Sequence, residues 1–146
     1  MISQAPIFTI HAELADIRHF GQTPYGERRV IDILGGRVDG PRLKGKILPG
    51  ADWQIVRPDG VTDLVARYGI ESDGGARIQR RAAPRSARGP RRARARRDGR
   101  AVALLFPHRD AVRDADPALA WLNRILALGT GAREKLAVHL DVYEVT

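Results

Sequence analysis

The chain has 146 residues, which predicts one domain with a single hydrophobic core. It has no cysteine, which excludes disulfides, thiolate metal sites and a cysteine nucleophile, and which fits a reducing, cytoplasmic compartment. The formal net charge of +8 comes from one segment, because Arg77–Arg100 holds 11 of the 25 basic residues while the rest of the chain has 14 basic and 16 acidic residues.

The start of the chain lacks the basic and apolar regions of a signal peptide, and no apolar run approaches the ~18 residues of a membrane helix. We therefore expect no membrane partner. The first strand is predicted at Ile7–Leu14, because apolar and polar residues alternate there. Its apolar face comprises Phe8, Ile10, Ala12 and Leu14.

A loop rich in glycine and proline is expected at residues 19–29, followed by a second strand at Arg29–Leu34 and by glycine-rich turns, with room for a bulge, at Gly35–Gly45. The densest mix of turn and strand signals is Gly45–Tyr68. There DWQIVR and LVARYGI read as two strands joined by a PDG turn, so a β-hairpin is predicted. SDGGA, at residues 72–76, is a second tight connection.

The segment from Arg80 to Arg100 has neither a strand nor a helix period. Further on, Asp116 as N-cap and Pro117 at the first helical position predict a short helix that ends near Asn123. Residues 124–128 fit either an extension of that helix or a strand. GTGARE is expected to form a turn, and Leu136–Val145 alternates as a final strand.

The fold class that these elements predict is all-β and mainly antiparallel, a small β-barrel with one short helix near 117–123. Residues 1–146 are expected to form a single barrel domain, interrupted at about 80–103 by an Arg/Ala/Pro-rich segment that is either aberrant or disordered.

The segment GGRVDGPRLKGKILPGADWQIVRPDGVTDLVARYGIESDGGARI resembles an uncharacterised family, domain of unknown function 3237, also called uncharacterised protein family 0311. TPYGERRVIDILGG, DPALAWLNRILALGTGAR and VHLDVYEV extend the likeness to residues 5–79 and 114–146. The DWQ, DGV and WLN motifs are specific in combination. The resemblance implies a small β-barrel with a pocket near these motifs, and no settled activity. The paired acids that the family usually has before GA are replaced here by Asp73-Gly74-Gly75.

Residues 81–114 do not resemble the family. A coding sequence that the genetic code permits for Leu104–Asp114, displaced by one nucleotide, reads YYFRTATRFE, which is similar to family motifs. The same displacement of Arg81–Pro90 permits the family-like VRHRGLREG. We therefore hypothesise that about residues 81–114 are translated out of frame. A disordered linker and a nucleic-acid-binding arm are the alternatives.

The predicted hairpin brings together the first group of candidate site residues. Asp52 and Gln54 share one strand face, whereas Trp53 lies on the other face with Ile55 and Arg57. Asp52 is a candidate general base, and Trp53 and Gln54 are candidate ligand contacts. The alternative is that Asp52 caps the LPG turn and Trp53 belongs to the core.

Arg67 and Tyr68 are further candidate catalytic residues, and they also point to opposite faces. Arg67 inside a barrel would pair with an anionic ligand or with Asp32, and outside it would be a solvated charge. Tyr68 is either catalytic or a core tyrosine. Trp121 and Asn123 are candidate ligand contacts on the short helix, with Asn123 as a C-cap the alternative.

No metal and no cofactor are expected, because His11 and His139 lack metal-binding spacing and no nucleotide fingerprint is present. The leading functional hypothesis is a barrel that binds a small organic molecule. The alternative is a cofactor-independent enzyme that uses acid/base chemistry, as an isomerase, cyclase or hydrolase. Nucleic-acid binding through the Arg-rich tract ranks third, because no aromatic residue is interleaved for base stacking. The sequence is compatible with both a monomer and a homo-oligomer.

Overall fold

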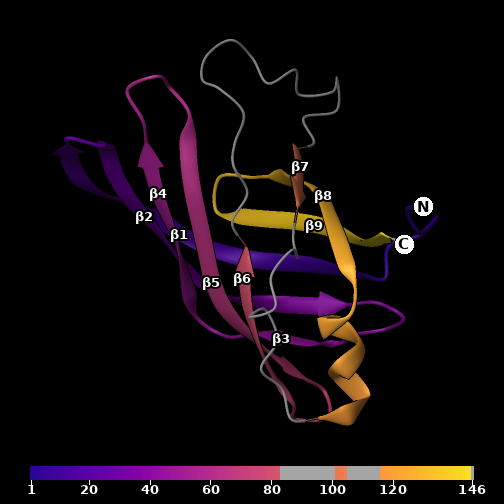
Figure 1. Ribbon diagram of the computed structural model, residues 1–146. Helices are drawn as coiled ribbons and strands as arrows, with labels where there is room; N and C mark the ends of the chain where they lie inside the picture. Colours follow the sequence, from indigo (N-terminus) through magenta and orange to yellow (C-terminus); the bar gives the residue numbers. More distant parts are fainter. Residues whose placement is uncertain (83–100, 105–115, 146) are drawn as a thin grey trace.

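The computed structural model describes the backbone of residues 1–82, 101–104 and 116–145, which Figure 1 draws in colour. Residues 83–100 and 105–115, which carry most of the out-of-frame hypothesis and of the Arg-rich segment, lie outside the described residues. The strands are β1 (Phe8–Thr23), β2 (Gly26–Asp39), β3 (Gly45–Ile47), β4 (Gly50–Val56), β5 (Thr62–Ser72), β6 (Arg77–Ala82), β7 (Ala101–Leu104), β8 (Leu126–Arg133) and β9 (Ala137–Val145), with one 3-10 helix, η1 (Pro117–Asn123).

These strands form one antiparallel sheet in the order β6-β5-β4-β2-β1-β9-β8-β7. Like β4, the short β3 lies between β2 and β5, because it pairs with both of these strands. Figure 1 shows that the sheet bends round on itself into a barrel-like ring. The predicted all-β, mainly antiparallel barrel with one short helix is confirmed. No strand pairing joins β6 to β7 in the described part of the chain.

The inside of the ring holds the hydrophobic core. The apolar face predicted for the first strand is buried as expected, with Phe8 and Ile10 each 1% exposed. Alternate residues of the neighbouring strands complete the core, because the side chains of a strand point to opposite faces in turn. The other buried strand residues of this core include Ile31, Ile33, Tyr68, Ile70, Ile78, Ala127 and Val142.

The short helix closes the lower end of the barrel in Figure 1. The carboxylate of Asp116 accepts a hydrogen bond from the backbone N–H of Ala118, so the predicted N-cap is confirmed. Leu119 and Leu122 are buried in the core. The C-cap is Arg124 rather than Asn123, and the chain then enters β8 at Leu126.

The strands are longer than the sequence predicts. Residues 19–29, expected to be a loop, extend β1 and β2 into a paired arm with a turn at Pro24-Tyr25. The glycines of Gly35–Gly45 do not end β2, which continues to Asp39. GTGARE is largely part of β8, with the turn beginning at Glu134. In each case cross-strand pairing overrides the local turn tendency of glycine.

Gly36 shows why glycine is needed inside one of these strands. It pairs with Ala12 near the register shift in β1, and its φ is +140°. A Cβ atom at this position would lie 2.0 Å from the backbone oxygen of His11. The two strands therefore approach each other more closely than any side chain at position 36 permits.

We expect Gly36→Ala to lower the free energy of unfolding by about 2–3 kcal/mol, because it adds both a steric clash and an unfavourable φ. Gly74→Ala is the matched control, since the nearest atom to its added Cβ would be the Ser72 hydroxyl at 3.8 Å. Urea denaturation of the two variants and the parent measures the difference. Equal losses at the two positions would contradict the close approach.

Candidate functional site

A cavity of about 230 Å³ lies inside the barrel. Most of its wall is aliphatic, and the strands β1, β2, β5 and β9 supply that part. Five polar residues also line it, and they come from four different strands: Asp52, Gln54, Tyr68, Arg80 and Arg133. The cavity therefore combines an apolar body with a few fixed polar groups, which is the usual composition of a small-molecule site.

Asp52 is the acidic group of this cavity. It lies on β4 opposite Ile31 of β2 and Ala66 of β5, so the strand alternation points its side chain inward. One carboxylate oxygen, Oδ2, accepts a hydrogen bond of 2.6 Å from the amide nitrogen of Gln54. The other, Oδ1, is buried and makes no hydrogen bond to any described residue.

Burial raises the pKa of Asp52 above its ordinary value of 3.8, because desolvation disfavours the charged carboxylate. The hydrogen bond from Gln54 and the positive charges of Arg133 and Arg29 act in the opposite direction and offset part of this rise. A carboxyl group held in this balance, in the wall of a cavity and with one oxygen that makes no hydrogen bond to the described residues, is suited to accept a proton or a hydrogen bond.

Gln54 holds Asp52 in place and is itself held. Its side-chain oxygen accepts a hydrogen bond of 2.8 Å from Nε of Arg29, which lies opposite it on β2. Gln54 is 5% exposed, so both ends of its amide are used within the protein. The amide orientation is thereby fixed: its N–H group faces Asp52 and its oxygen faces Arg29.

Tyr68 and Arg80 form a second polar pair in the cavity wall. They lie opposite each other on β5 and β6, and the guanidinium of Arg80 donates a hydrogen bond to the Tyr68 hydroxyl. Arg80 is 1% exposed, and burial lowers its pKa to about 9. The group is still mainly charged at neutral pH, so the barrel interior contains a fixed cation.

The structure brings three of the sequence-predicted site residues, Asp52, Gln54 and Tyr68, to one cavity. It places Trp53 on the outer face of the sheet, 53% exposed, and Arg67 on that face as well. Asn123 is exposed on η1. Trp53 and Arg67 face outward because side chains alternate along β4 and β5, and each of these residues is next in sequence to an inward-facing one.

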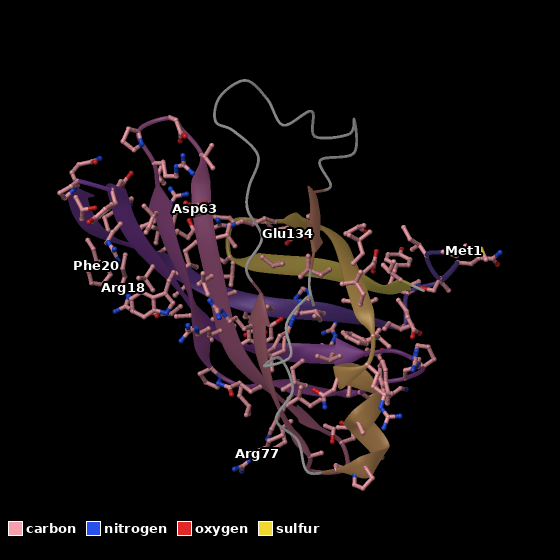
Figure 2. The ribbon with its side chains drawn as sticks, in the orientation of Figure 1. Met1, Arg18, Phe20, Asp63, Arg77 and Glu134 are labelled. Atoms are coloured by element: carbon pink, nitrogen blue, oxygen red, sulfur yellow. The ribbon has the colours of Figure 1, made fainter. Side chains whose placement is uncertain are left out.

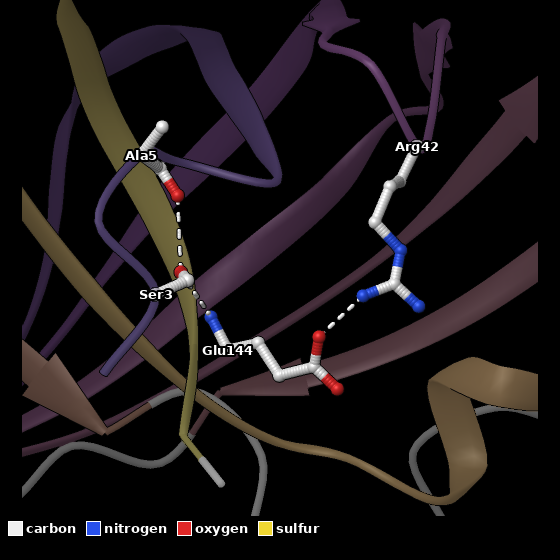
Figure 3. Close-up of polar contacts among 4 residues, drawn as sticks. All are labelled: Ser3, Ala5, Arg42 and Glu144. Atoms are coloured by element: carbon white, nitrogen blue, oxygen red, sulfur yellow. Dashed lines mark hydrogen bonds and ion pairs between the residues drawn. The ribbon is translucent and has the colours of Figure 1, made fainter. Parts of the chain in front are cut away.

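Trp121 packs against the core at the lower end of the barrel instead of lining the cavity. The guanidinium of Arg42 lies 3.7 Å from the centre of its ring system and is also paired with Glu144 of β9. Figure 3 shows this ion pair beside Ser3, whose hydroxyl accepts from the Glu144 backbone N–H and donates to the Ala5 oxygen. Trp121 therefore helps to close the barrel.

Sequence reasoning did not identify Arg80 and Arg133 as cavity residues or Arg29 as the hydrogen-bond partner of Gln54. Arg80 was assigned to the irregular Arg-rich segment, but it lies on β6, where it follows Ile78 by two residues on the inward face. The apolar Ile78, two positions before Arg80 and therefore on the same strand face, was the available signal. Arg133 was placed in a turn, and only the extension of β8 brings it to the cavity.

The two histidines that the sequence singled out are cross-strand neighbours. His11 and His139 pair on β1 and β9, with ring centres 6.1 Å apart. Among the described residues, no group of three or more His, Asp or Glu side chains could hold a metal ion. No helix within the described ranges is long and apolar enough to span a membrane.

The comparisons with known proteins agree on one family. The model of the family described as "Protein of unknown function (DUF3237)" matches residues 3–145. A "UPF0311 protein" of Rhodopseudomonas palustris strain TIE-1 is 35% identical over 143 residues, covering 95% of this chain and 94% of that protein.

Solved structures give the same result. A conserved protein of unknown function from Rhodopseudomonas palustris is 31% identical with a TM-score of 0.76, and the match covers 100% of this chain and 99% of that one. A beta-barrel like protein from Acinetobacter baumannii AYE is 28% identical with a TM-score of 0.76, and the match covers 100% and 97% of the two chains.

We predict that Asp52 makes stability fall as pH rises. The unfolded carboxyl titrates near 3.8 and the folded one higher, so the unfolded state binds fewer protons between the two pKa values. Replacing Asp52 with Asn removes this dependence. The unfolding free energy of Asp52→Asn, relative to the parent, should therefore increase as pH rises from about 4 through the raised pKa.

Glu71→Gln is the control with opposite sign. Lys46 and Arg77 lower the pKa of Glu71 below 4.5, so its stabilising effect is present above that pH and is lost as the pH falls. Denaturant titrations across the acid range compare the two variants. A flat difference between Asp52→Asn and the parent would contradict a raised pKa of Asp52.

Proposed function

The chain belongs to the family described as "Protein of unknown function (DUF3237)", and we propose that it binds a small, mainly apolar organic molecule with a hydrogen-bond donor inside its barrel. The observation that carries this proposal is that Asp52 lines an aliphatic cavity and that its buried Oδ1 atom makes no hydrogen bond to the described residues. A buried polar atom without a partner is costly, so a donor on a ligand stabilises the complex.

The size of the cavity limits the ligand. A volume of about 230 Å³ is slightly below the ~300 Å³ at which typical ligand pockets begin, and an engineered cavity of about 150 Å³ holds benzene. One aromatic ring or two fused rings fit this space. A hydroxyl or amine N–H on the ring would meet Asp52, and the aliphatic walls from β1, β2 and β9 would contact the ring faces.

A matched pair of probes tests the proposal: 2-naphthol, which carries a hydroxyl donor, and naphthalene, which does not. We expect the parent protein to bind 2-naphthol at least about tenfold more tightly, because only the hydroxyl satisfies Asp52. Asp52→Leu should reduce this ratio to about one, while Asp52→Asn, whose side-chain oxygen also accepts, should keep most of it. Fluorescence titration measures the affinities.

Filling the cavity gives an independent test. Ala66 lines the cavity from β5, so Ala66→Leu should abolish binding of both probes. The control is Ala132→Leu on β8, because Ala132 lies on the opposite face from the inward Gly131 and Arg133. Binding that survives Ala66→Leu, or an equal affinity of the parent for the two probes, would refute the proposal.

A second candidate function, acid/base catalysis without a cofactor, is favoured by the raised pKa of Asp52. A carboxylate in this cavity would take a proton from a carbon or hydroxyl acid, and Arg80 would stabilise the negative charge that develops. Asp52→Asn separates the two functions, because binding is retained whereas turnover is lost. Nucleic-acid binding depends mainly on residues 83–100, outside the described residues, and would weaken steeply with salt.

A further inference from the structure

The outer face of β2, β4 and β5 presents the exposed Trp53 side chain between two rows that contain charged residues. Cross-strand pairing arranges this face in three rows: Val30, Trp53 and Val65 lie side by side, and the rows before and after them face outward as well, although Val30 itself is only 2% exposed. Trp53 is 53% exposed. We call this surface the Trp53 face; its nine residues are Arg28, Ile55, Asp63, Val30, Trp53, Val65, Asp32, Ala51 and Arg67.

The β1–β2 arm continues this surface. Phe20, near the bulge that precedes Gly21 on β1, is 60% exposed. Figure 2 shows Phe20 and Arg18 projecting from the outer side of the arm, away from the barrel interior. A hollow of about 250 Å³ lies between Phe20, Trp53 and Val65. Two large exposed aromatic side chains beside a hollow are typical of a protein interface.

The charges of the Trp53 face are arranged with opposite signs on either side of β4. In one outer row Arg28 lies on β2 and Asp63 on β5, with Ile55 between them. In the other outer row the signs are reversed, because Asp32 lies on β2 and Arg67 on β5. The central row is uncharged.

This arrangement is complementary to itself. A two-fold axis that lies in the interface and runs along β4 brings the β2 side of one copy against the β5 side of the other, row by row. Arg28 then faces Asp63 of the second copy, and Asp32 faces Arg67. The uncharged central rows of the two copies meet, with Trp53 at the axis beside its own counterpart.

The ion pairs within a single chain are compatible with this dimer. Asp32 is paired with Arg18 at 2.6 Å and Asp63 lies 3.9 Å from Arg57, all at the surface. Arg28 and Arg67 have no ion-pair partner within the described residues. A second copy would supply one carboxylate to each of these two arginines without burying an unmatched charge.

The geometry points to a homodimer in which two copies pack face to face through the Trp53 face, with the strands of the two sheets aligned. Three strands about 4.8 Å apart and three rows about 6.8 Å apart give a face of roughly 14 Å by 20 Å. This is smaller than the ~800 Å² per partner of a standard interface, so the dimer is expected to dissociate in the micromolar range.

A pair of charge reversals tests the dimer. Arg28→Asp places like charges opposite each other twice in the homodimer, and so does Asp63→Arg, so each variant alone should be monomeric. Mixed in equal amounts, the two variants should form a heterodimer, because the acidic position 28 of one then faces Asp63→Arg of the other, and the native Arg28 faces the native Asp63. Sedimentation velocity from about 1 to about 300 µM measures this.

The controls carry the same charge changes at distant surface positions. Lys135→Asp and Glu134→Arg lie in the turn between β8 and β9, and Figure 2 shows Glu134 well away from Phe20. Both should dimerise like the parent, whereas Trp53→Ala should be monomeric. A parent that is monomeric at every concentration would overturn the inference. So would charge-reversed variants that dimerise alone, or a mixture that does not associate.

Discussion

The alternation of side chains along β4 decides which residues face the cavity and which face outward. Because β4 is paired on both sides, its register with β2 and β5 is fixed, and a slip of one residue would exchange its two faces. In the observed register Asp52 and Gln54 face the cavity while Trp53 and Ile55 face outward. The same strand thus supplies the acidic group of the barrel interior and, with Trp53, the centre of the outer face.

The polar groups inside the barrel are tolerated because most of them are paired with one another. Gln54 connects Arg29 to Asp52 through two hydrogen bonds, and Arg80 donates to Tyr68. Burial still has a cost, which is seen in the raised pKa of Asp52 and in the pKa of about 9 for Arg80. An arrangement of this kind is more specific than an apolar core and less stable, which is typical of a site rather than of a scaffold.

Much of this architecture was predictable from the sequence, and the reasons are physical. The period of two in Ile7–Leu14 identified the buried face of β1, and Asp116 with Pro117 identified the start of η1. The strand extensions were not predictable, since the glycines of β2 and β8 are needed for close strand contacts that only the tertiary fold creates. The local sequence pattern predicts a turn at the glycines of β2 and at those of β8.

For the candidate site, the alternation of β4 was enough to place Asp52 and Gln54 together and to separate them from Trp53. Pattern alone could not decide which of the two faces was inside, so Trp53 and Arg67 were included as site candidates. Arg80 was missed because the composition of the segment that follows it obscured the end of β6. Its position opposite Tyr68 becomes visible only through the pairing of β5 with β6.

A carbon-13 NMR titration of the Asp52 carboxyl group, assigned with Asp52→Asn, in the free protein and with 2-naphthol examines the proposed site without intermediate steps. We expect a pKa above 3.8 in the free protein, and a lower pKa in the complex, because a hydroxyl donor stabilises the ionised carboxylate. A carboxyl group that titrates at 3.8 or below and does not respond to the probe would contradict the central claim that a buried, incompletely satisfied Asp52 defines the site.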